Sequence, residues 1–521
     1  MREVRIDKTW LQALMIILLA LGIFFRFVNL DRKVYWGDEV FTSFRLSGYT
    51  VAELKQQIGN GRVVSIEDFQ RYQYPSPEKN AADTVKTLAL EDSQHVPLYY
   101  VMTRFWVQWF GNSVTATRSF SAVISLLVFP CLYWLCKELF ESPVITWVAI
   151  ALIAVSPFQV LYAQEARPYS LWIVMIFLSS AALLRAMRVK TKASWGIYGL
   201  TVVLGLYTHV FFTLVAIGHG LYLTIIERFR LSKTLTSYLL SSLIGILAFV
   251  PWIWVIINAP SKFDAQSWIN TKSSFVSICI RWAGIVSRAF LDLGVGPDDS
   301  FKRLIPLIPL ILLVLALIAY SLYFLYRHAP QRVWLFVFTL IGITALAFML
   351  PDFVLGRRYG TTRFITPCIL GIQLSLAYLL ATKITSPLIS NQQQKLWRLI
   401  TVVLISIGVL SCTLSSQAQM WWNKVPDINK HYPQIAKIIN QIPQPLLITD
   451  AHPIHLGTLS YLLDSKVQLQ LVTDTNIPDI PKNFSDVFLF STSDSLRIGI
   501  EKEYNSKTKQ IYEQLWKLEL R

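Results

Sequence analysis

Two adjacent carboxylates, Asp38 and Glu39, follow the first long apolar run of the chain, within the stretch VYWGDEVFTSF (34–44). A carboxylate can take the proton of a hydroxyl that becomes acidic only in the transition state, so the pair is a candidate general base. Successive side chains diverge in an extended loop, and we therefore expect one acid to act while the other orients it or binds a cation or acceptor. The alternative is a pair of solvated loop acids that only stay outside the bilayer.

The other unusual polar residues also stand at the ends of apolar runs. They come from four further segments: Glu91, Asp92 and His95; Gln164, Glu165 and Arg167; His209; and Arg357, Arg358 and Arg363. Transporters carry ionisable residues deep within their spans, and few are visible here. Contributions from several segments to one side of a membrane are more typical of an active site than of a permeation path.

Glu91 and His95 raise the question of a metal. They are four residues apart, so a helical turn would put them on one face, where Glu39 could complete a site. The segment ends in Val96-Pro97, however, and a residue before proline resists the helical conformation. Two interpretations stay open: a divalent metal ion held by His95 and Glu91, or a hydrogen bond that orients the acid pair.

The amino-acid composition indicates which class of protein carries these residues. Hydrophobic residues make up 54% of the 521 residues and charged residues only 15%, with a mean hydropathy of +0.46. Soluble domains carry about 25% charged residues, so we expect a polytopic membrane protein. The net charge of +16 does not indicate nucleic-acid binding, because many Lys and Arg residues lie between apolar runs. The five cysteines lie in or beside apolar segments and predict no disulfide framework.

Apolar runs of about 20 residues, enough to cross the hydrocarbon core, predict eleven transmembrane helices. Nine of them stand near 10–28, 118–138, 143–162, 169–187, 236–257, 304–326, 331–350, 364–382 and 397–415. The run 194–227 is too long for one crossing and predicts two short ones with a turn near Tyr207-Thr208-His209. Basic clusters then place the N-terminus in the cytoplasm and the C-terminus outside. The first run lacks a small-x-small cleavage site, which indicates a retained span.

Two long segments, 29–117 and 258–303, would lie outside. Each contains an apolar stretch, 96–110 and 273–293, that we interpret as a helix lying in the membrane interface. A crossing at 273–293 would invert every later segment. We assign residues 1–415 to the membrane domain and 416–521 to a small extracytoplasmic α/β domain of alternating strands and helices, ending in one strand over QIYEQLWKLEL.

One short outer loop, in PDFVLGRRYGTTRF, breaks the rule that keeps basic residues inside. Arginine presents a fork of donors that matches phosphate oxygens, and it stays charged beside a membrane. We expect Arg363, helped by Arg357 or Arg358 and by Arg167, to hold a phosphate. The alternative is a loop that binds anionic lipid headgroups.

Several motifs, in the right order, resemble those of the GT-C glycosyltransferases, in the branch of the protein O-mannosyltransferases, the lipid A aminoarabinose transferases and their bacterial relatives. The first outer loop of that class carries an Asp-Glu motif, which GDEVFTSF resembles. Its His-x-Pro-leucine-tyrosine segment and the following Arg-Ser pair are similar to QHVPLYYVMTRFWVQWFGNSVTATRSFSAV. SPFQVLYAQEARPYSLW, LYTHVFF and RRYGTTRFITP also fit. The resemblance covers roughly residues 1–415.

The resemblance implies an α-helical polytopic membrane enzyme of the GT-C type in a bacterial inner membrane. It would move a sugar from a polyprenyl-phosphate carrier to an acceptor hydroxyl or phosphate on a lipid, glycan or protein at the outer face. Asp38 would be the base and Glu39 its partner. The donor phosphate would be held by Arg363, Arg357, Arg358 and Arg167, and the substrate site lined by Gln164, Glu165, Tyr169, His209 and Tyr359.

No nucleotide-binding fingerprint is found, as expected for an outward-facing site that uses a lipid-linked donor. The competing interpretation is a transporter or flippase of lipid-linked sugars without transferase activity. It would require ionisable residues deep within spans, together with repeat symmetry.

Overall fold

The computed structural model describes residues 8–259, 272–296, 299–473 and 477–519. The chain divides into two compact units. The helical unit comprises Met1–Leu30, Gln94–Tyr99 and Arg118–Ala418, and the α/β unit comprises Asp31–Ser93, Tyr100–Thr117 and Gln419–Arg521. The α/β unit therefore extends beyond the predicted 416–521 segment, because most of the first long loop folds with it.

A helix lies at each of the eleven predicted spans. These helices are α1 (Lys8–Phe27), α7 with α8 (Val114–Leu126, Val128–Leu139), α9 with α10 (Pro143–Ala154, Pro157–Ala163), α11 (Tyr169–Val189), α12 (Lys192–Thr208), α13 (Phe212–Ile226), α14 (Lys233–Asn258), α16, η3 and α17 (Phe301–Leu304, Ile305–Leu307, Ile308–His328), α18 (Gln331–Leu355), α19 (Thr366–Thr385) and α20 (Asn391–Gln417). Within the described residues, seven are long and apolar enough to cross a membrane, or eight if the bent pair α9–α10 counts as one span. The chain is a polytopic membrane protein.

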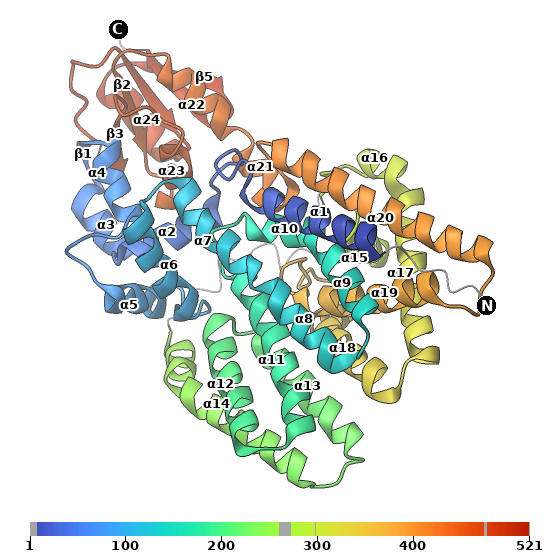
Figure 1. Cartoon of the computed structure of the whole chain (residues 1–521). Coiled ribbons are helices and arrows are strands. Elements are labelled where there is room, and N and C mark those ends of the chain that lie inside the picture. The colour runs from blue at the N-terminus through green and yellow to red at the C-terminus, as the bar shows by residue number, and fades with distance from the viewer. Residues whose placement is uncertain (1–7, 260–271, 297–298, 474–476, 520–521) are drawn as a thin grey trace. The chain divides into compact units, whose positions relative to one another are not determined.

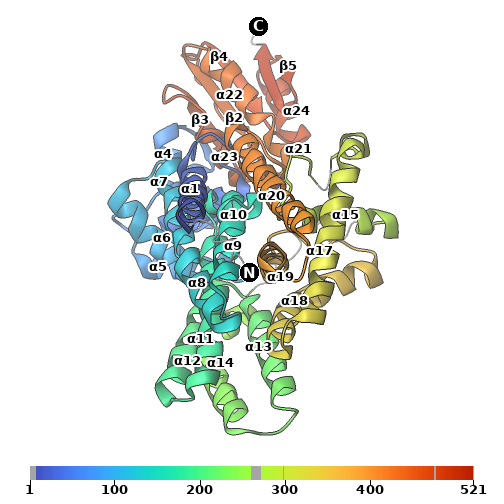
Figure 2. The same ribbon diagram turned by 45° about the vertical axis from the view of Figure 1, so that its right-hand side comes forward.

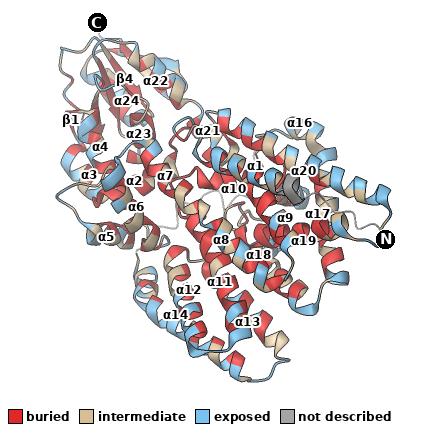
Figure 3. Ribbon diagram, in the orientation of Figure 1, coloured by how far each residue is buried: buried red, intermediate tan, exposed pale blue. Residues whose placement is uncertain are grey.

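Two helices of the helical unit form its core. Figure 2 views α19 nearly along its axis, with α9, α17, α18 and α20 around it. Most residues of α11 and α19 are buried, whereas α14 and α17 expose most of theirs (Figure 3). Apolar exposure on outer helices is expected where lipid is the solvent.

The break between α9 and α10 bends the chain by 57° at Ser156-Pro157. Proline has no N–H to donate, so the carbonyls at the end of α9 need other partners. The buried Arg26 of α1 donates to the carbonyls of Ile153, at 3.3 Å, and Ala154, at 2.9 Å. These bonds fix the bend that leads into the turn 164–168, where several predicted site residues lie.

The segment 273–293 forms α15 (Phe275–Ser287), a helix of 13 residues. At a rise of about 1.5 Å per residue it is about 20 Å long, too short for a hydrocarbon core of about 30 Å. The interpretation that this helix lies in the interface stays a prediction. The other stretch forms α6 (Pro97–Phe110), which exposes Phe105, Trp109 and Phe110.

The sheet of the α/β unit has six strands in the order β1-β3-β2-β4-β6-β5. The strands are β1 (Asn60–Ser65), β2 (Pro445–Thr449), β3 (Gln468–Val472), β4 (Asp486–Phe490), β5 (Lys507–Tyr512) and β6 (Leu515–Glu519). The central β2 is parallel to β3 and β4, and the other pairs are antiparallel. β1, from the first loop, lies beside β3 (Figure 1). The prediction of one last strand was wrong, because Glu513, with φ of +46°, turns the chain into the β5–β6 hairpin.

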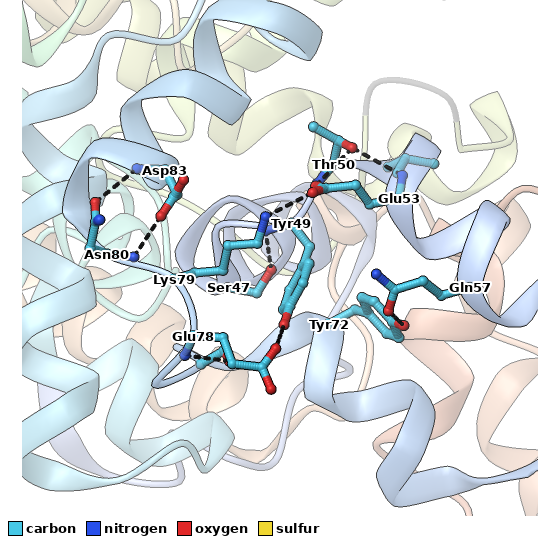
Figure 4. A network of polar contacts seen from close by, with 12 residues as sticks. Ser47, Tyr49, Thr50, Glu53, Gln57, Tyr72, Glu78, Lys79, Asn80 and Asp83 are labelled. Atoms are coloured by element: carbon cyan, nitrogen blue, oxygen red, sulfur yellow. Dashed lines mark hydrogen bonds and ion pairs between the residues drawn. The ribbon is translucent and has the colours of Figure 1, made fainter.

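The helices of this unit are α2 (Gly37–Ser47), α3 (Val51–Ile58), α4 (Ile66–Gln70), α5 (Ala81–Glu91), α21 (Pro426–Asn429), α22 (Tyr432–Asn440), α23 (Pro453–Ser460) and α24 (Asp494–Glu503), with the short turns η1 (Arg71–Gln73) and η4 (Trp422–Lys424). A polar network joins the segments around α3 (Figure 4). Thr50 and Glu53 form a capping box, Lys79 binds Glu53 at 2.7 Å, and Tyr49 donates to Glu78 at 2.7 Å. These bonds stiffen the loop that carries α2.

Candidate active site

The acid pair lies in the first turn of α2. The prediction of an extended loop was wrong here, because the N–H groups of Glu39 and Val40 already donate to the carbonyl of Trp36, at 2.8 and 3.0 Å. Acids are favoured at this end of a helix, where the unpaired N–H groups carry partial positive charge. Adjacent helical side chains also diverge, so Asp38 and Glu39 still point to different surroundings.

The two acids differ in burial. Glu39 is fully buried and forms an ion pair with Lys424 at 3.0 Å, with the Lys424 side chain 1% exposed. Asp38 is only half-buried. The more exposed acid is therefore Asp38, while Glu39 is held by a cation. The assignment of Asp38 as base and Glu39 as partner stays a prediction. Sequence reasoning missed Lys424, which lies 385 residues from Glu39 and belongs to no motif.

Glu91 does not share a helical turn with His95, because α5 ends at Glu91 and α6 begins only at Pro97. The carboxylate of Glu91 instead pairs with the buried Arg45 of α2 and accepts the N–H of Val51 at 2.9 Å. In the part of the chain that the structure describes, no group of three or more His, Cys, Asp or Glu residues is arranged to hold a metal. A metal at His95 and Glu91 stays a prediction.

His95 lies in the helical unit and contacts Arg167, with 2.6 Å between His95 Nε2 and the guanidinium. A guanidinium can only donate, so the imidazole accepts at Nε2. Arg167 belongs to the turn 164–168, and its carbonyl accepts a hydrogen bond from Ser121 of α7 at 3.3 Å. Tyr99 binds the Ser121 hydroxyl at 2.8 Å. The contact therefore links the start of α6 to the turn after the broken helix.

His209 lies between α12 and α13 and stacks on Trp172 of α11, with ring centroids 4.1 Å apart and planes 6° apart. Burial holds the pKa of His209 well below its usual range, and the neighbouring groups His95, Arg167 and Arg363 lower it further. These four residues come from four separate segments. We call them the basic cluster (His95, Arg167, His209 and Arg363).

The loop that contains Arg363 is held by a buried acid of α18, Asp352. Its carboxylate accepts from the N–H of Tyr359 at 2.5 Å, from the N–H of Gly360 at 3.2 Å and from the indole of Trp282 at 3.0 Å. We call this set of bonds the Asp352 latch. Sequence reasoning missed it, although an acid near the end of an apolar helix and just before three arginines was a signal.

The three arginines of this loop have different surroundings. Arg358 donates to Ser273 at 2.7 Å, and Arg357 lies 3.5 Å from the Tyr359 hydroxyl. Arg363 is half-buried, with its guanidinium 5.5 Å from the ring centre of Phe364. Phe364 packs against Phe211, with ring centroids 5.0 Å apart, and Phe211 packs against His209, at 5.3 Å, which brings Arg363 toward the basic cluster. Arg357 and Arg358 have partners within the loop and at its flank.

The predicted lining residues fall into two groups. Tyr169 lies 6.3 Å from the His209 ring, and Glu165 is buried in the turn beside Arg167. Gln164 instead donates its amide to the carbonyls of Phe25 and Val28 at the end of α1. Its observed contacts are therefore structural.

The arrangement offers two kinds of chemistry, each within its own unit. The α/β unit presents a half-buried carboxylate next to a buried, cation-paired one. The helical unit gathers two guanidinium groups and two imidazoles, which suit an anion such as a phosphate.

Comparison with known proteins gives one matching family model and several similar solved structures. Residues 94–254 match the family model of the dolichyl-phosphate-mannose-protein mannosyltransferases. ArnT from Cupriavidus metallidurans in the apo state is similar with a TM-score of 0.54 and 14% identity, covering 97% of this chain and 98% of that chain. The same protein bound to undecaprenyl phosphate gives a TM-score of 0.48 and 14% identity, covering 98% of each chain. No curated protein matches the chain by sequence.

The Archaeoglobus fulgidus oligosaccharyltransferase, tethered with an acceptor peptide, gives a TM-score of 0.45 and 13% identity, covering 90% of this chain. The present chain spans only 64% of the length of that protein. At such identities the likeness shows a fold, and the fold argument rests on apo ArnT, for which the TM-score exceeds 0.5. The matched segment 94–254 contains His95, Arg167 and His209.

Proposed function

We propose that this chain, a membrane glycosyltransferase of the GT-C class, moves a sugar from a polyprenyl-phosphate carrier to an acceptor at the outer face of the membrane. The acceptor atom would be a hydroxyl or phosphate oxygen on a lipid, glycan or protein. The proposal includes a bacterial inner membrane, a cytoplasmic N-terminus and an extracytoplasmic α/β unit. Basic clusters in the sequence support that orientation.

One observation carries the proposal: His95 contacts Arg167 at 2.6 Å, and both residues, together with Arg363 from a third segment, lie near enough to the buried His209 to lower its pKa. A leaving polyprenyl phosphate keeps its negative charge and gains more on oxygen as the sugar departs. Preorganised donors in a site shielded from water stabilise such a charge strongly. ArnT, which shares the fold, has been crystallised with undecaprenyl phosphate, a carrier of the proposed class.

In the proposed step, Asp38 takes the proton of the acceptor hydroxyl as its oxygen bonds to the anomeric carbon of the sugar. The bond from that carbon to the phosphate oxygen breaks, and its electron pair stays on the phosphate. Arg363 and Arg167 stabilise the leaving phosphate. Glu39, held by Lys424 at 3.0 Å, keeps the first turn of α2 in place.

A divalent metal ion at His95 and Glu91 is a separate proposal, and no part of this step depends on it. The observed partners of the two residues are Arg167 for His95 and Arg45 with Val51 for Glu91. A metal would have to share or replace these contacts.

The test is transfer by the purified chain in detergent, with undecaprenyl phosphate linked to labelled mannose or labelled aminoarabinose as donors. A lipid extract and a hydroxyl-bearing peptide serve as acceptors. The proposal predicts protein-dependent release of free undecaprenyl phosphate together with a labelled product. A flippase would leave the label on the carrier in detergent and would instead move the donor across proteoliposomes, an outcome that contradicts the proposal.

A further inference from the structure

Lys424 lies just beyond the last membrane helix, in the short turn η4. We propose that Lys424 is a positioning residue for sugar transfer: it holds Glu39, and thereby the first turn of α2, so that Asp38 faces the acceptor. This inference rests on the proposed function and gives the C-terminal segment a part in it.

The pair that joins Lys424 to Glu39 is buried on both sides. The side chains are 1% and 0% exposed, and 3.0 Å separates Nζ from Oε2. The same ammonium lies 5.6 Å from the ring centre of Trp36. Since the Trp36 carbonyl accepts the first two N–H bonds of α2, Lys424 contacts both the residue that begins the helix and the acid in its first turn.

The backbone around Lys424 is held in an unusual shape. The next residue, Val425, has φ of +47° and ψ of +70°, a left-handed conformation that a β-branched residue adopts only at a cost. Asn429 stabilises it, because its buried amide donates to the carbonyls of Lys424 at 2.7 Å and Val425 at 3.3 Å. The turn buries the Lys424 side chain while Val425 stays 42% exposed.

A merely structural role would make Lys424 the attachment between α2 and the C-terminal segment, but other bonds already serve that purpose. The N–H of Val34 donates to the carbonyl of Gln419 at 3.0 Å. Tyr35 packs edge-on against Tyr461, with centroids 4.7 Å apart, and the buried Gln73 donates to the carbonyl of Gly457 at 3.2 Å. These bonds attach α2 to the C-terminal segment without Lys424, which leaves the buried ion pair available for positioning Glu39.

The test compares Lys424→Met with Lys430→Met in the full-length chain. Lys430 lies in the same segment, with its side chain half-exposed and its ammonium 3.9 Å from Asp427. Lys430→Met therefore also removes one positive charge, but from the surface instead of a buried pair. We expect Lys424→Met to lower kcat about tenfold or more while the donor KM stays within about twofold, because a transition-state arrangement is lost rather than a binding contact. Lys430→Met should behave as the parent protein, and Lys424→Arg should restore a large part of kcat.

A folded Lys424→Met variant with kcat within about twofold of the parent overturns the inference. Asp38→Asn and Glu39→Gln, measured beside it, separate the two proposals, since near-normal kcat in both of these variants would contradict the proposed function itself. If Lys424→Met does not fold, the double variant Glu39→Gln/Lys424→Met removes both buried charges together. If the double variant turns over as fast as Glu39→Gln alone, Lys424 acts through Glu39. A further loss of about tenfold in the double variant contradicts this.

Discussion

The Asp352 latch gives a prediction whose size follows from its geometry. One carboxylate oxygen accepts from the N–H of Tyr359, the other from the Trp282 indole, and the N–H of Gly360 lies 3.2 Å from both. In Asp352→Asn, one oxygen becomes an NH₂ group that cannot accept, so at least one buried donor loses its partner. Such a loss costs about 1–3 kcal/mol.

That loss should weaken binding of the lipid-linked sugar donor, because the latch holds the loop that carries Arg363. If donor binding requires the ordered loop, about 1–3 kcal/mol corresponds to a rise in donor KM of about 5- to 150-fold. The assay measures donor KM and kcat with the labelled undecaprenyl-phosphate sugar, and thermal unfolding checks that the helices remain intact.

A second variant, Gly360→Ala, disturbs the latch from another side, and Gly342→Ala is its matched control. A Cβ added at Gly360 would lie 2.6 Å from Trp282 and 2.9 Å from the Asp352 carboxylate, so Gly360→Ala should raise donor KM as well. A Cβ at Gly342, in α18, meets nothing within 4 Å, so Gly342→Ala should leave it unchanged. A folded Asp352→Asn variant with the parent's donor KM would refute the reasoning.

Three further outcomes are expected. Arg363→Lys replaces a donor fork by a point charge and should raise donor KM about tenfold without lowering the unfolding temperature; unchanged donor affinity contradicts the phosphate assignment. Because burial holds the pKa of His209 well below 6.5, the unfolded chain binds a proton there that the folded chain does not, so stability falls as the pH drops below about 6.5. His209→Gln should flatten this acid loss in melting curves between about pH 7.5 and 5, and an unaltered curve counts against it. If a metal at His95 and Glu91 is required, exhaustive chelation abolishes transfer and added Zn²⁺ or Mg²⁺ restores it; full turnover after chelation eliminates the metal.

The positions of the helices could be predicted because each depends on one local property, a run of apolar residues. Even the division of 194–227 into α12 and α13 follows from its length and from the basic clusters at both ends. The bend at Ser156-Pro157 follows from proline chemistry. The sequence did not show, however, that Arg26, 127 residues away from Ile153, donates to the carbonyls at the bend. His219 was also missed, because it stands within an apolar run; it is a buried residue of α13 that contacts Ser180 and Tyr198.

Which strands form the sheet of the α/β unit was harder to predict, because strand partners can lie far apart in the sequence. β1 pairs with β3 across about 400 residues of chain, and nothing in the local pattern of NGRVVS indicates its partner. The hairpin at Glu513 depends on a positive φ. Glycine and asparagine usually mark such a turn, and QIYEQLWKLEL contains neither, so the sequence did not predict it.

The site shows a similar division between local and distant information. Asp38, Arg167, His209 and Arg363 were identifiable because unusual residue types stand at the ends of apolar runs. Lys424 and Asp352 were not, because each acts through a partner that only the folded chain brings close. Helix α2 was misread as a loop, since Gly37 and the aromatic residues before it suggested a turn.

The central claim is that Asp38 removes a proton from the acceptor during sugar transfer. The most direct test measures kcat of Asp38→Asn with the labelled undecaprenyl-phosphate sugar, beside Glu39→Gln and the parent protein. Asn keeps the shape and loses the basicity, so we predict a fall in kcat of about 100-fold or more, with expression and donor binding unchanged. Loss in Glu39→Gln alone would exchange the two roles, and near-normal turnover in both variants would contradict the account.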